Sequence, residues 1–226
     1  KLIRLKSRKN VLSFGLSESC DVRAENIRIL PDGGTSCTIK YGEKRIDASI
    51  PAYGQHMVYA AAEGAAVGFA MGLDCDEIRN GIAAYKTVGR RGAVTDTGFI
   101  TLIDDCYNAN PDSMDCAVDS LMKMSGRHVC VLSDMRELGE NSPEMHAAVG
   151  EYIKNKGVEL VLACGEMSRY LCETAGERAV YFNAKEELIE QLPVYIRKGD
   201  RVLVKASLGM HMETAAEALK KMKETI

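Results

Sequence analysis

The first third of the chain alternates between short apolar runs and turn-forming residues. Four runs have the composition of β-strands: Asn10–Leu16, Asn26–Leu30, Cys37–Tyr41 and Lys44–Ile50. We expect them to form part of an antiparallel sheet. The pattern then changes to two helices, Met57–Leu73, which is rich in small residues, and Cys75 to about Tyr85. Asp74 and Glu77 have the spacing of a capping box at the start of the second helix.

Beyond Val88–Gly92 strands and helices alternate to the end of the chain, and we place a domain boundary at this break. The expected strands are Phe99–Ile103, His128–Leu132, Glu159–Ala163, Ala179–Phe182 and Arg201–Lys205. The expected helices are Pro111–Met124, Pro143–Lys156, Met167–Thr174, Lys185–Leu192 and Met212–Thr225. Ser142 and Asn183 are candidate helix caps. Such alternation predicts an α/β fold with a mainly parallel sheet that is covered on both faces.

One connection in this second region carries a dense group of polar side chains. Asp104, Asp105, Tyr107, Asn108 and Asn110 follow an expected strand within one short stretch. Right-handed crossovers place the loops after the parallel strands at one edge of the sheet, where ligands bind in open α/β folds. We therefore expect a ligand site at this edge. The alternative is a polar turn that only caps the following helix.

Composition and charge exclude several classes of protein. A chain of 226 residues with 46% hydrophobic content can bury one sizeable core or two small ones. The net charge of -3 and the absence of a long basic run argue against a nucleic-acid partner. The sequence shows no apolar stretch of membrane-spanning length and no signal-peptide pattern, so we expect a soluble cytoplasmic protein. Eight single, scattered cysteines predict free thiols, and we expect four to be buried in helices or strands: Cys75, Cys116, Cys130 and Cys172.

The polar stretch also resembles a known family. The segment Asp104–Met114 is similar to the signature that opens the C-terminal domain of the Mur ligases, in the branch that adds D-alanyl-D-alanine. Further similar segments follow the family's order: Gly54–Tyr59, Gly89–Arg90, Leu132–Glu140 with His146, and Val202–Ser207 with Met210 and Glu213. The signature is highly specific, and the other segments are strong together.

The resemblance implies how the chain is organised. Mur ligases carry a P-loop of the Gly-Lys-Thr type that binds ATP phosphates, and this sequence has no such motif. We therefore expect residues 1–88 to be the β/α tail of a P-loop-type central ATPase domain. Residues 89–226 are expected to form a complete, Rossmann-like C-terminal domain. The family's N-terminal domain, which holds the UDP moiety, would be missing, and the chain alone would be inactive.

The resemblance further implies a reaction. ATP would phosphorylate the terminal carboxylate of UDP-N-acetylmuramoyl-tripeptide, and the amine of D-alanyl-D-alanine would then attack the acyl phosphate. Such a reaction must gather its reactants and exclude water. Any Mg²⁺ would arrive with ATP and be held largely by a segment outside this chain, because the sequence shows no metal-ligand cluster.

Several residues match family positions that bind anions or the nucleotide. Arg90 would pair with the ATP phosphates, a task that Arg91 could share. Asp105 would accept hydrogen bonds from the ribose. Lys205 and Ser207 would meet a carboxylate or a phosphate, although Lys205 could equally be a surface lysine.

The signature itself supplies the remaining substrate-binding candidates. Tyr107, Asn108 and Asn110 would line the junction between the nucleotide and the incoming dipeptide, and Asp104 would hold the loop. Asn110 could instead cap the helix that begins at Pro111. These two roles of Asn110 remain open at the level of the sequence.

Two histidines and several departures from the family pattern complete the picture. His56 matches a position near the adenine but could be a packed residue, and we expect His146 to be structural. After His56 the family usually has an asparagine that reads the adenine, whereas Tyr59 and Ala60 stand there in this chain. Three further positions differ from the family pattern: Ser133, Ala206 and Leu208.

These departures leave a hypothesis of a different class open. The chain could belong to a degenerate, non-catalytic Mur-ligase homologue that acts as a binding module. A third hypothesis is a ligase of the folate or cyanophycin type, which joins a different amino acid. The segment Tyr107–Pro111 argues against this third hypothesis.

Overall fold

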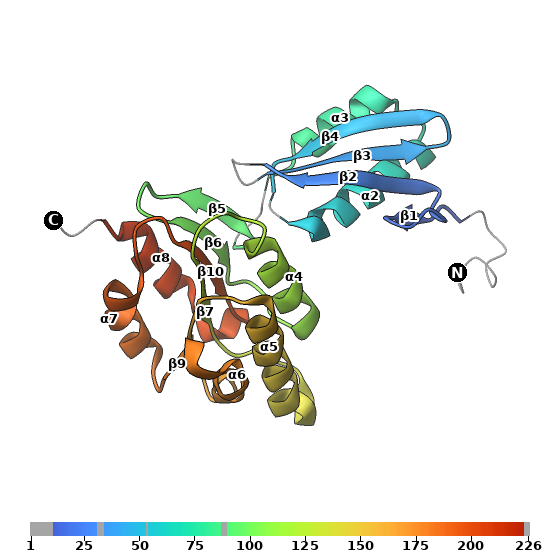
Figure 1. Cartoon of the computed structure of the whole chain (residues 1–226). Coiled ribbons are helices and arrows are strands. Elements are labelled where there is room, and N and C mark those ends of the chain that lie inside the picture. The colour runs from blue at the N-terminus through green and yellow to red at the C-terminus, as the bar shows by residue number, and fades with distance from the viewer. Residues whose placement is uncertain (1–10, 31–33, 53, 87–89, 224–226) are drawn as a thin grey trace. The chain divides into compact units, whose positions relative to one another are not determined.

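The computed structural model describes residues 11–30, 34–52, 54–86 and 90–223. The chain forms two compact units, Lys1–Lys86 and Thr87–Ile226 (Figure 1). Val88 and Gly89 of the expected boundary lie outside the described residues, as do Asn10 of the first expected strand and Thr225 of the last expected helix. Within the described ranges, no helix is both long and apolar enough to cross a membrane.

The first unit contains a four-stranded sheet in the order β1-β2-β3-β4. Its strands are β1 (Phe14–Gly15), β2 (Val22–Ile29), β3 (Thr35–Tyr41) and β4 (Lys44–Ile50). The expected antiparallel pairing is confirmed for β2, β3 and β4. The prediction is wrong for β1, which is short and pairs in parallel with β2. The carboxylate of Asp21 accepts hydrogen bonds from the backbone N–H and the hydroxyl of Ser13, and this link closes the loop that returns the chain beside β1.

Two helices pack on this sheet, α2 (Gln55–Ala70) and α3 (Cys75–Ala83). Their close contact depends on small side chains, because a Cβ added at Gly68 would lie 2.8 Å from Cγ1 of Ile78. The capping box predicted for Asp74 and Glu77 is confirmed. Apolar residues of the strands and of both helices form the core of this unit.

The second unit contains a six-stranded sheet in the order β5-β6-β10-β7-β8-β9. The strands are β5 (Ala93–Asp96), β6 (Thr101–Asp105), β7 (His128–Leu132), β8 (Leu160–Cys164), β9 (Ala179–Phe182) and β10 (Arg201–Lys205). All neighbouring pairs are parallel except β5 and β6, which are antiparallel. The predicted α/β fold with a mainly parallel sheet is therefore confirmed.

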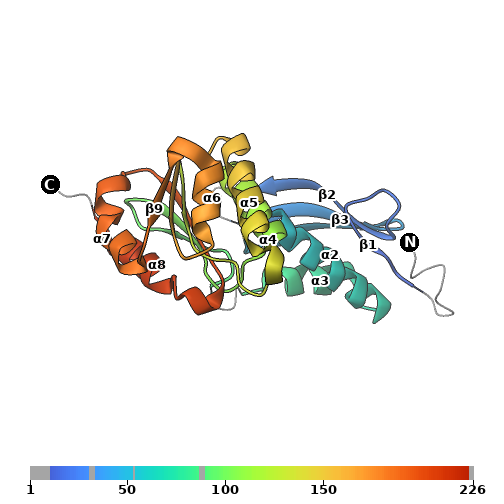
Figure 2. The ribbon, with the colours of Figure 1, turned by 90° about the horizontal axis from the view of Figure 1, so that it is seen from below.

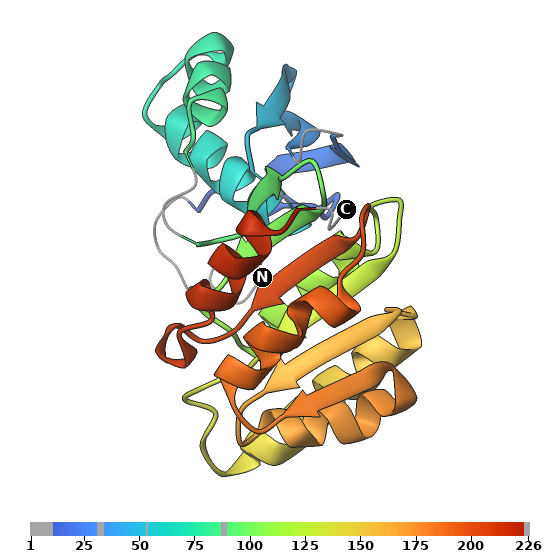
Figure 3. The same ribbon diagram turned by 90° about the vertical axis from the view of Figure 1, so that its left-hand side faces the viewer.

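Five α-helices cover both faces of this sheet. They are α4 (Pro111–Leu121), α5 (Ser142–Lys156), α6 (Ser168–Ala175), α7 (Lys185–Tyr195) and α8 (Glu213–Lys221). Helices α4, α5 and α6 lie on one face, and α7 and α8 lie on the other (Figures 2 and 3). Valine and leucine side chains of the strands fill a core under α7 and α8, as expected for a parallel sheet buried on both faces.

The strand that carries the signature is displaced from its predicted position. It was expected at Phe99–Ile103 but spans Thr101–Asp105. The hydroxyl of Thr97 accepts hydrogen bonds from the N–H groups of residues 99 and 100, so these residues form the turn between β5 and β6. Asp104 and Asp105 are therefore the last two residues of the strand rather than part of the loop.

Two predicted helix caps are wrong. Ser142 has helical backbone angles and is the first residue of α5, preceded by Asn141 at the N-cap. Ala184, not Asn183, is the N-cap residue of α7. At neither N-cap does the side chain accept a hydrogen bond from a backbone N–H of the first helical turn. Both helices therefore depend on tertiary packing rather than on capping.

All eight cysteines are free thiols, as predicted. Cys130 and Cys172 are buried, as expected of thiols that behave as small hydrophobic side chains. The same expectation is wrong for Cys116, which lies on the exposed side of α4, and for Cys75, which is only partly buried.

The position of β10 determines where a ligand can bind. It lies between β6 and β7, although it follows both of them in the chain. The helices that leave β6 and β7 cover one face of the sheet, whereas α8, which leaves β10, covers the other (Figure 3). The carboxyl end of β10 is thus a topological switch point, the position at which open α/β sheets form a binding crevice.

Candidate functional site

Lys205 joins the switch point to the signature loop. It is the last residue of β10 and is paired in register with Asp105 of β6. Its Nζ donates to Oδ2 of Asp105 at 2.5 Å and to the backbone oxygen of Asn108 at 2.9 Å. The residue is 2% exposed. The alternative that Lys205 is a surface lysine is therefore wrong.

Ser207 joins the switch point to the loop that follows β7. Its hydroxyl accepts a hydrogen bond from the N–H of Arg136 at 2.9 Å, and its own N–H donates to the backbone oxygen of Asp134 at 3.2 Å. Oδ1 of Asp134 in turn accepts hydrogen bonds from the N–H and the hydroxyl of Ser168, the first residue of α6. The loops after β6, β10 and β7 are thus linked to one another, and the β7 loop is linked to α6.

A second ionic network surrounds Asp104, which is 2% exposed. Its Oδ2 accepts from Arg90 at 2.6 Å and from Lys220 at 3.4 Å. Arg90 also donates to Glu217 at 2.9 Å. Hydrogen bonds from Arg90 and Lys220 hold the pKa of Glu217 below its ordinary value. The Asp104 carboxylate thus contacts Arg90 and Lys220 of α8, and its expected role of holding the loop stays a prediction. Glu217 and Lys220 were not predicted because they lie on α8, far along the chain.

Arg91 has surroundings unlike those of Arg90. Its guanidinium carbon lies 3.8 Å from the centre of the Tyr107 ring, a cation–π contact. Arg91 is exposed, and within the described part of the chain it forms no ion pair with a carboxylate. Tyr107 is 41% exposed, and Asn108 beside it is also exposed. These three side chains are exposed, so a ligand in solution can reach them.

Asn110 is the N-cap of α4. Its side-chain oxygen accepts from the N–H of Ser113 at 2.8 Å, and the Ser113 hydroxyl accepts from the N–H of Asn110 at 3.0 Å. Of the two roles left open by the sequence, the structure places Asn110 in the capping role. This cap fixes the end of the signature loop.

The two histidines occupy different environments. His146 in α5 is completely buried; its Nε2 accepts from the N–H of Met135 at 2.9 Å, and its Nδ1 lies 2.7 Å from the backbone oxygen of Ser142. This arrangement fits the structural role expected of His146, since it ties the β7 loop to α5. His56 is an exposed residue in the first turn of α2, in the first unit.

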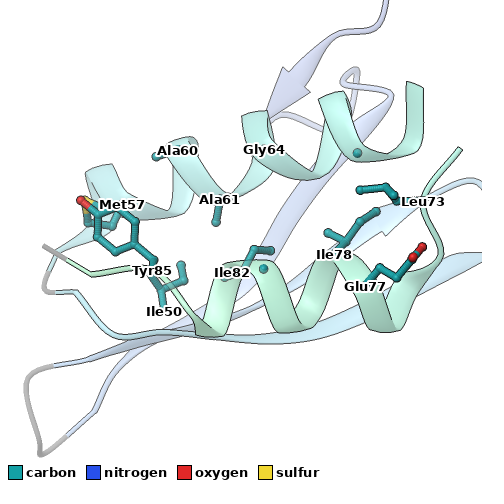
Figure 4. A pocket seen from close by; sticks show the side chains of 12 residues that line it. Ile50, Met57, Ala60, Ala61, Gly64, Leu73, Glu77, Ile78, Ile82 and Tyr85 are labelled. Atoms are coloured by element: carbon teal, nitrogen blue, oxygen red, sulfur yellow. The ribbon is translucent and has the colours of Figure 1, made fainter. Parts of the chain in front are cut away.

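A cavity of about 360 Å³ lies in the first unit, between α2 and α3 (Figure 4). It is lined by apolar side chains and glycines, and Ala60 is among them. Its one charged lining residue, Glu77, already accepts a hydrogen bond from the N–H of Asp74. The cavity thus offers packing surface rather than groups for catalysis, and the polar site lies at the switch point of the second unit.

Among the residues that the structure describes, no three acidic, histidine or cysteine side chains come together in a way that could hold a metal ion. The row of Asp112, Asp115 and Asp119 on α4 instead shows charge repulsion. Burial, and then the neighbouring Asp119 and Asp112 carboxylates, raise the pKa of Asp115 to about 6, while Lys156 opposes the shift. Oδ1 of Asp115 is buried and accepts no hydrogen bond from any described residue.

Replacing Asp115 by asparagine is expected to stabilise the protein near neutral pH. Since the pKa of this carboxyl group is higher in the folded state than in the unfolded state, its contribution to stability is fully present below the unfolded pKa of 3.8 and is lost as the pH rises through about 6. After allowance for solvent screening, the gain should be on the order of 1 kcal/mol at about pH 7.5 and close to zero at about pH 4. Urea unfolding at both pH values measures it. Glu190→Gln, the same loss of a carboxylate at an exposed position of α7 that takes no part in the Asp115 repulsion, is the control and should bring no such gain.

Comparison of this sequence with known proteins identifies relatives of the chain. The family model described as "Mur ligase, glutamate ligase domain" matches residues 89–208. UDP-N-acetylmuramoyl-tripeptide--D-alanyl-D-alanine ligase of Escherichia coli is 35% identical over 202 residues, which are 88% of this chain and 44% of that protein. The chain thus spans about half the length of the curated relatives it matches.

Solved structures show the same fold. MurF from Acinetobacter baumannii superposes with a TM-score of 0.82 at 26% identity, over 91% of this chain and 46% of that one. MurF from Thermotoga maritima, crystallised with ADP, has a TM-score of 0.84 at 23% identity, over 97% of this chain and 51% of that one. At that identity the second likeness concerns the fold alone. Because the family model covers residues 89–208 of 226, more than half of the sequence, this chain belongs to the Mur ligase family.

Proposed function

We propose that this chain is the C-terminal part of an ATP-dependent ligase that joins D-alanyl-D-alanine to UDP-N-acetylmuramoyl-tripeptide in peptidoglycan precursor synthesis. The observation that carries the proposal is the similarity of this chain to ligases that bear the name of this reaction. The similarity to the Escherichia coli ligase covers 88% of this chain. The position of the signature loop at the switch point supports it. In this proposal residues 1–88 are the tail of the central ATPase domain and residues 89–226 are the C-terminal domain. The expected compartment is the cytoplasm.

The reaction would proceed in two steps. A terminal carboxylate oxygen of the tripeptide takes the γ-phosphoryl group of ATP, and ADP leaves. The amine nitrogen of D-alanyl-D-alanine then attacks the acyl carbon, phosphate leaves, and the nitrogen gives up a proton. The acyl phosphate must be protected from water between these steps, so the contribution of this chain is to position the reactants and to exclude water.

The nucleotide-binding role proposed for Asp105 fits its geometry. Oδ2 is held by Lys205, and no described residue donates a hydrogen bond to Oδ1. The side chain is 20% exposed, so Oδ1 can accept a hydrogen bond from a ribose hydroxyl. Exposed Tyr107 and Asn108 would line the path of the dipeptide. Ser207 is used within the protein, so its backbone and loop rather than its hydroxyl would face a substrate.

The contacts of Arg90 and Arg91 favour Arg91 for binding the ATP phosphates, whereas the resemblance implies that Arg90 binds them. The guanidinium of Arg90 is already shared between Asp104 and Glu217, and a phosphate would have to compete with these carboxylates. The guanidinium of Arg91 stands exposed on Tyr107. The described side chains offer no cage for Mg²⁺, and we assign no step to the metal in this chain.

The alternative of a non-catalytic homologue is favoured by two of the four departures from the family pattern. Ala60 and Leu208 are exposed and lack the polar groups expected there. The other two departures are accommodated by their surroundings. Ser133 is buried and donates to the backbone oxygen of Cys164 at 2.5 Å, and Ala206 is completely buried. These two residues therefore give no reason to expect a damaged site.

Phosphate release by the full-length protein distinguishes the two functions. The assay contains ATP, UDP-N-acetylmuramoyl-tripeptide and D-alanyl-D-alanine, and each reactant is omitted in turn. A ligase is expected to release phosphate only when all three are present, because the acyl phosphate forms on one substrate and is consumed by another. If a well-folded full-length protein releases none, the binding-module hypothesis replaces the ligase.

A further inference from the structure

The ammonium group of Lys205 is enclosed by the protein. It donates to the Asp105 carboxylate and to the backbone oxygen of Asn108, and the residue is 2% exposed. A buried charge is costly unless it is paired and hydrogen-bonded, so these two contacts are what allow a lysine at this position. A ligand that approached from solvent would find little of its surface. Lys205 therefore cannot play the role of a lysine that meets the carboxylate or phosphate of a substrate.

The same two contacts constrain the shape of the signature loop. Asp105 is the last residue of β6, and Asn108 lies three residues further on, so Lys205 ties together both ends of a short turn. Beyond this turn Ala109 is buried, and Asn110 is held by its capping box with Ser113. The backbone of the loop is thus fixed at three successive places.

The signature loop leaves two side chains and one carboxylate oxygen accessible. Tyr107 and Asn108 point away from the core, with Arg91 against the Tyr107 ring. Asp105 has one oxygen engaged by Lys205, and its Oδ1 receives no hydrogen bond from the described residues. A single buried lysine therefore determines which carboxylate oxygen and which two loop side chains are available at the switch point.

We propose that Lys205 is a positioning residue: it touches no substrate, and it orients the Asp105 carboxylate and holds the turn that presents Tyr107 and Asn108. The identity of the ligand that these groups meet rests on the proposed function. The restraint on the loop does not, because it follows from contacts inside the second unit.

Limited proteolysis of the chain tests the restraint directly. Chymotrypsin cleaves after tyrosine, and cleavage within a folded protein tracks the population of locally opened states. In Lys205→Met we expect cleavage after Tyr107, measured by mass spectrometry, to become at least about tenfold faster. Cleavage after Tyr181, which is 37% exposed in a different part of the sheet, serves as the internal control and should keep its wild-type rate. Lys185→Met, the same substitution on a partly exposed lysine of α7 whose Nζ donates to the backbone oxygen of His211, should alter neither rate.

The double variant Lys205→Met/Asp105→Asn keeps the test decisive if the single variant unfolds. It leaves no unpaired charge at this position, so the fold and the rate at Tyr181 should be preserved while the turn is still released. An unchanged rate after Tyr107 in a folded variant that lacks Lys205 would overturn the proposal. Equal acceleration at both tyrosines in the double variant would also overturn it, because Lys205 would then stabilise the whole unit rather than the loop.

Kinetics of the full-length protein connect the restraint to function. If Lys205 acts through Asp105, the single variants Lys205→Met and Asp105→Asn should raise the KM for ATP by similar factors, and the double variant should be no worse than the more impaired single variant. If Lys205 bound a substrate independently of Asp105, the effects of the two single variants on kcat/KM would multiply in the double variant. If the wild-type full-length protein has no ligase activity, the proposed function is wrong. The role of Lys205 is still decided by the proteolysis result.

Discussion

Replacing Gly150 by alanine is expected to destabilise the second unit by about 3 kcal/mol, because the added methyl group has no space. A Cβ at this position of α5 would lie 2.1 Å from the backbone oxygen of Leu171 and 2.2 Å from the hydroxyl of Thr174, both in α6. That hydroxyl donates to the backbone oxygen of Ala147 at 2.7 Å and so joins the two helices. A backbone atom cannot turn aside as a flexible side chain can, so α5 and α6 would have to separate.

The expected sign is the opposite of what helix propensity predicts. Within a helix, alanine is favoured over glycine by about 1 kcal/mol, so the clash must outweigh that gain. Gly64→Ala is the matched control, because a Cβ at Gly64 in α2 would meet no atom within 4 Å. The control should therefore be neutral or slightly stabilising. Urea unfolding followed by circular dichroism compares both variants with the wild type, and a fully stable Gly150→Ala would contradict the close packing of α5 on α6.

The sequence was most informative where an apolar run is bounded by turn-forming residues. His128–Leu132, Ala179–Phe182 and Arg201–Lys205 are strands with the predicted ends. Each is a short run that begins directly after a charged residue, Arg127, Arg178 or Asp200, so pattern and structure coincide. Strand β5 was not predicted, because its four residues include Thr95 and Asp96 and it lies at the edge of the sheet, where hydrophobic alternation is weak.

The displaced strand β6 shows where hydropathy misleads. Phe99 resembles a strand residue but lies in a turn, whereas Asp104 and Asp105 resemble loop residues but lie in the strand. A carboxylate that is buried in a sheet is tolerated only when counter-charges or hydrogen-bond donors reach it. Those counter-charges come from Lys205, Arg90 and Lys220, and Lys220 lies 116 residues away from Asp104. No local pattern reveals such pairs, because the register between β6 and β10 creates the pair of Lys205 with Asp105, and the packing of α8 against β6 brings Lys220 to Asp104.

The candidate site was therefore predictable as a location but not as a set of roles. The polar stretch after β6 was found from the sequence, and the resemblance gave it a chemistry. Whether a polar residue faces a ligand or another residue of the protein depended on contacts that the sequence does not encode locally. Asn110 caps a helix, Ser207 links two loops, and Lys205 is enclosed, whereas Tyr107 and Asn108 remain available.

Replacing Arg90 by methionine is expected to lower the free energy of unfolding of the second unit by about 2 kcal/mol. Methionine keeps the length of the side chain but removes the charge that lies 2.6 Å from the buried carboxylate of Asp104. Loss of one partner of a fully buried ion pair costs about 3–5 kcal/mol. The expected loss is smaller because Lys220 remains 3.4 Å from the same carboxylate and Arg90 is 30% exposed.

Two further variants separate this structural role of Arg90 from a role in binding phosphate. Arg90→Met/Asp104→Asn should recover at least about half of the lost stability, since a neutral amide needs no counter-charge. Arg91→Met should cost at most about 1 kcal/mol, because it removes one exposed cation–π contact. Urea unfolding of the chain and nucleotide affinity of the full-length protein are measured for all three.

If Arg90→Met is fully stable yet loses affinity, Arg90 serves the ligand and its pairing with Asp104 contributes little. If Arg90→Met is destabilised and only Arg91→Met loses affinity, the phosphate contact belongs to Arg91, and Arg90 holds Asp104 in the sheet.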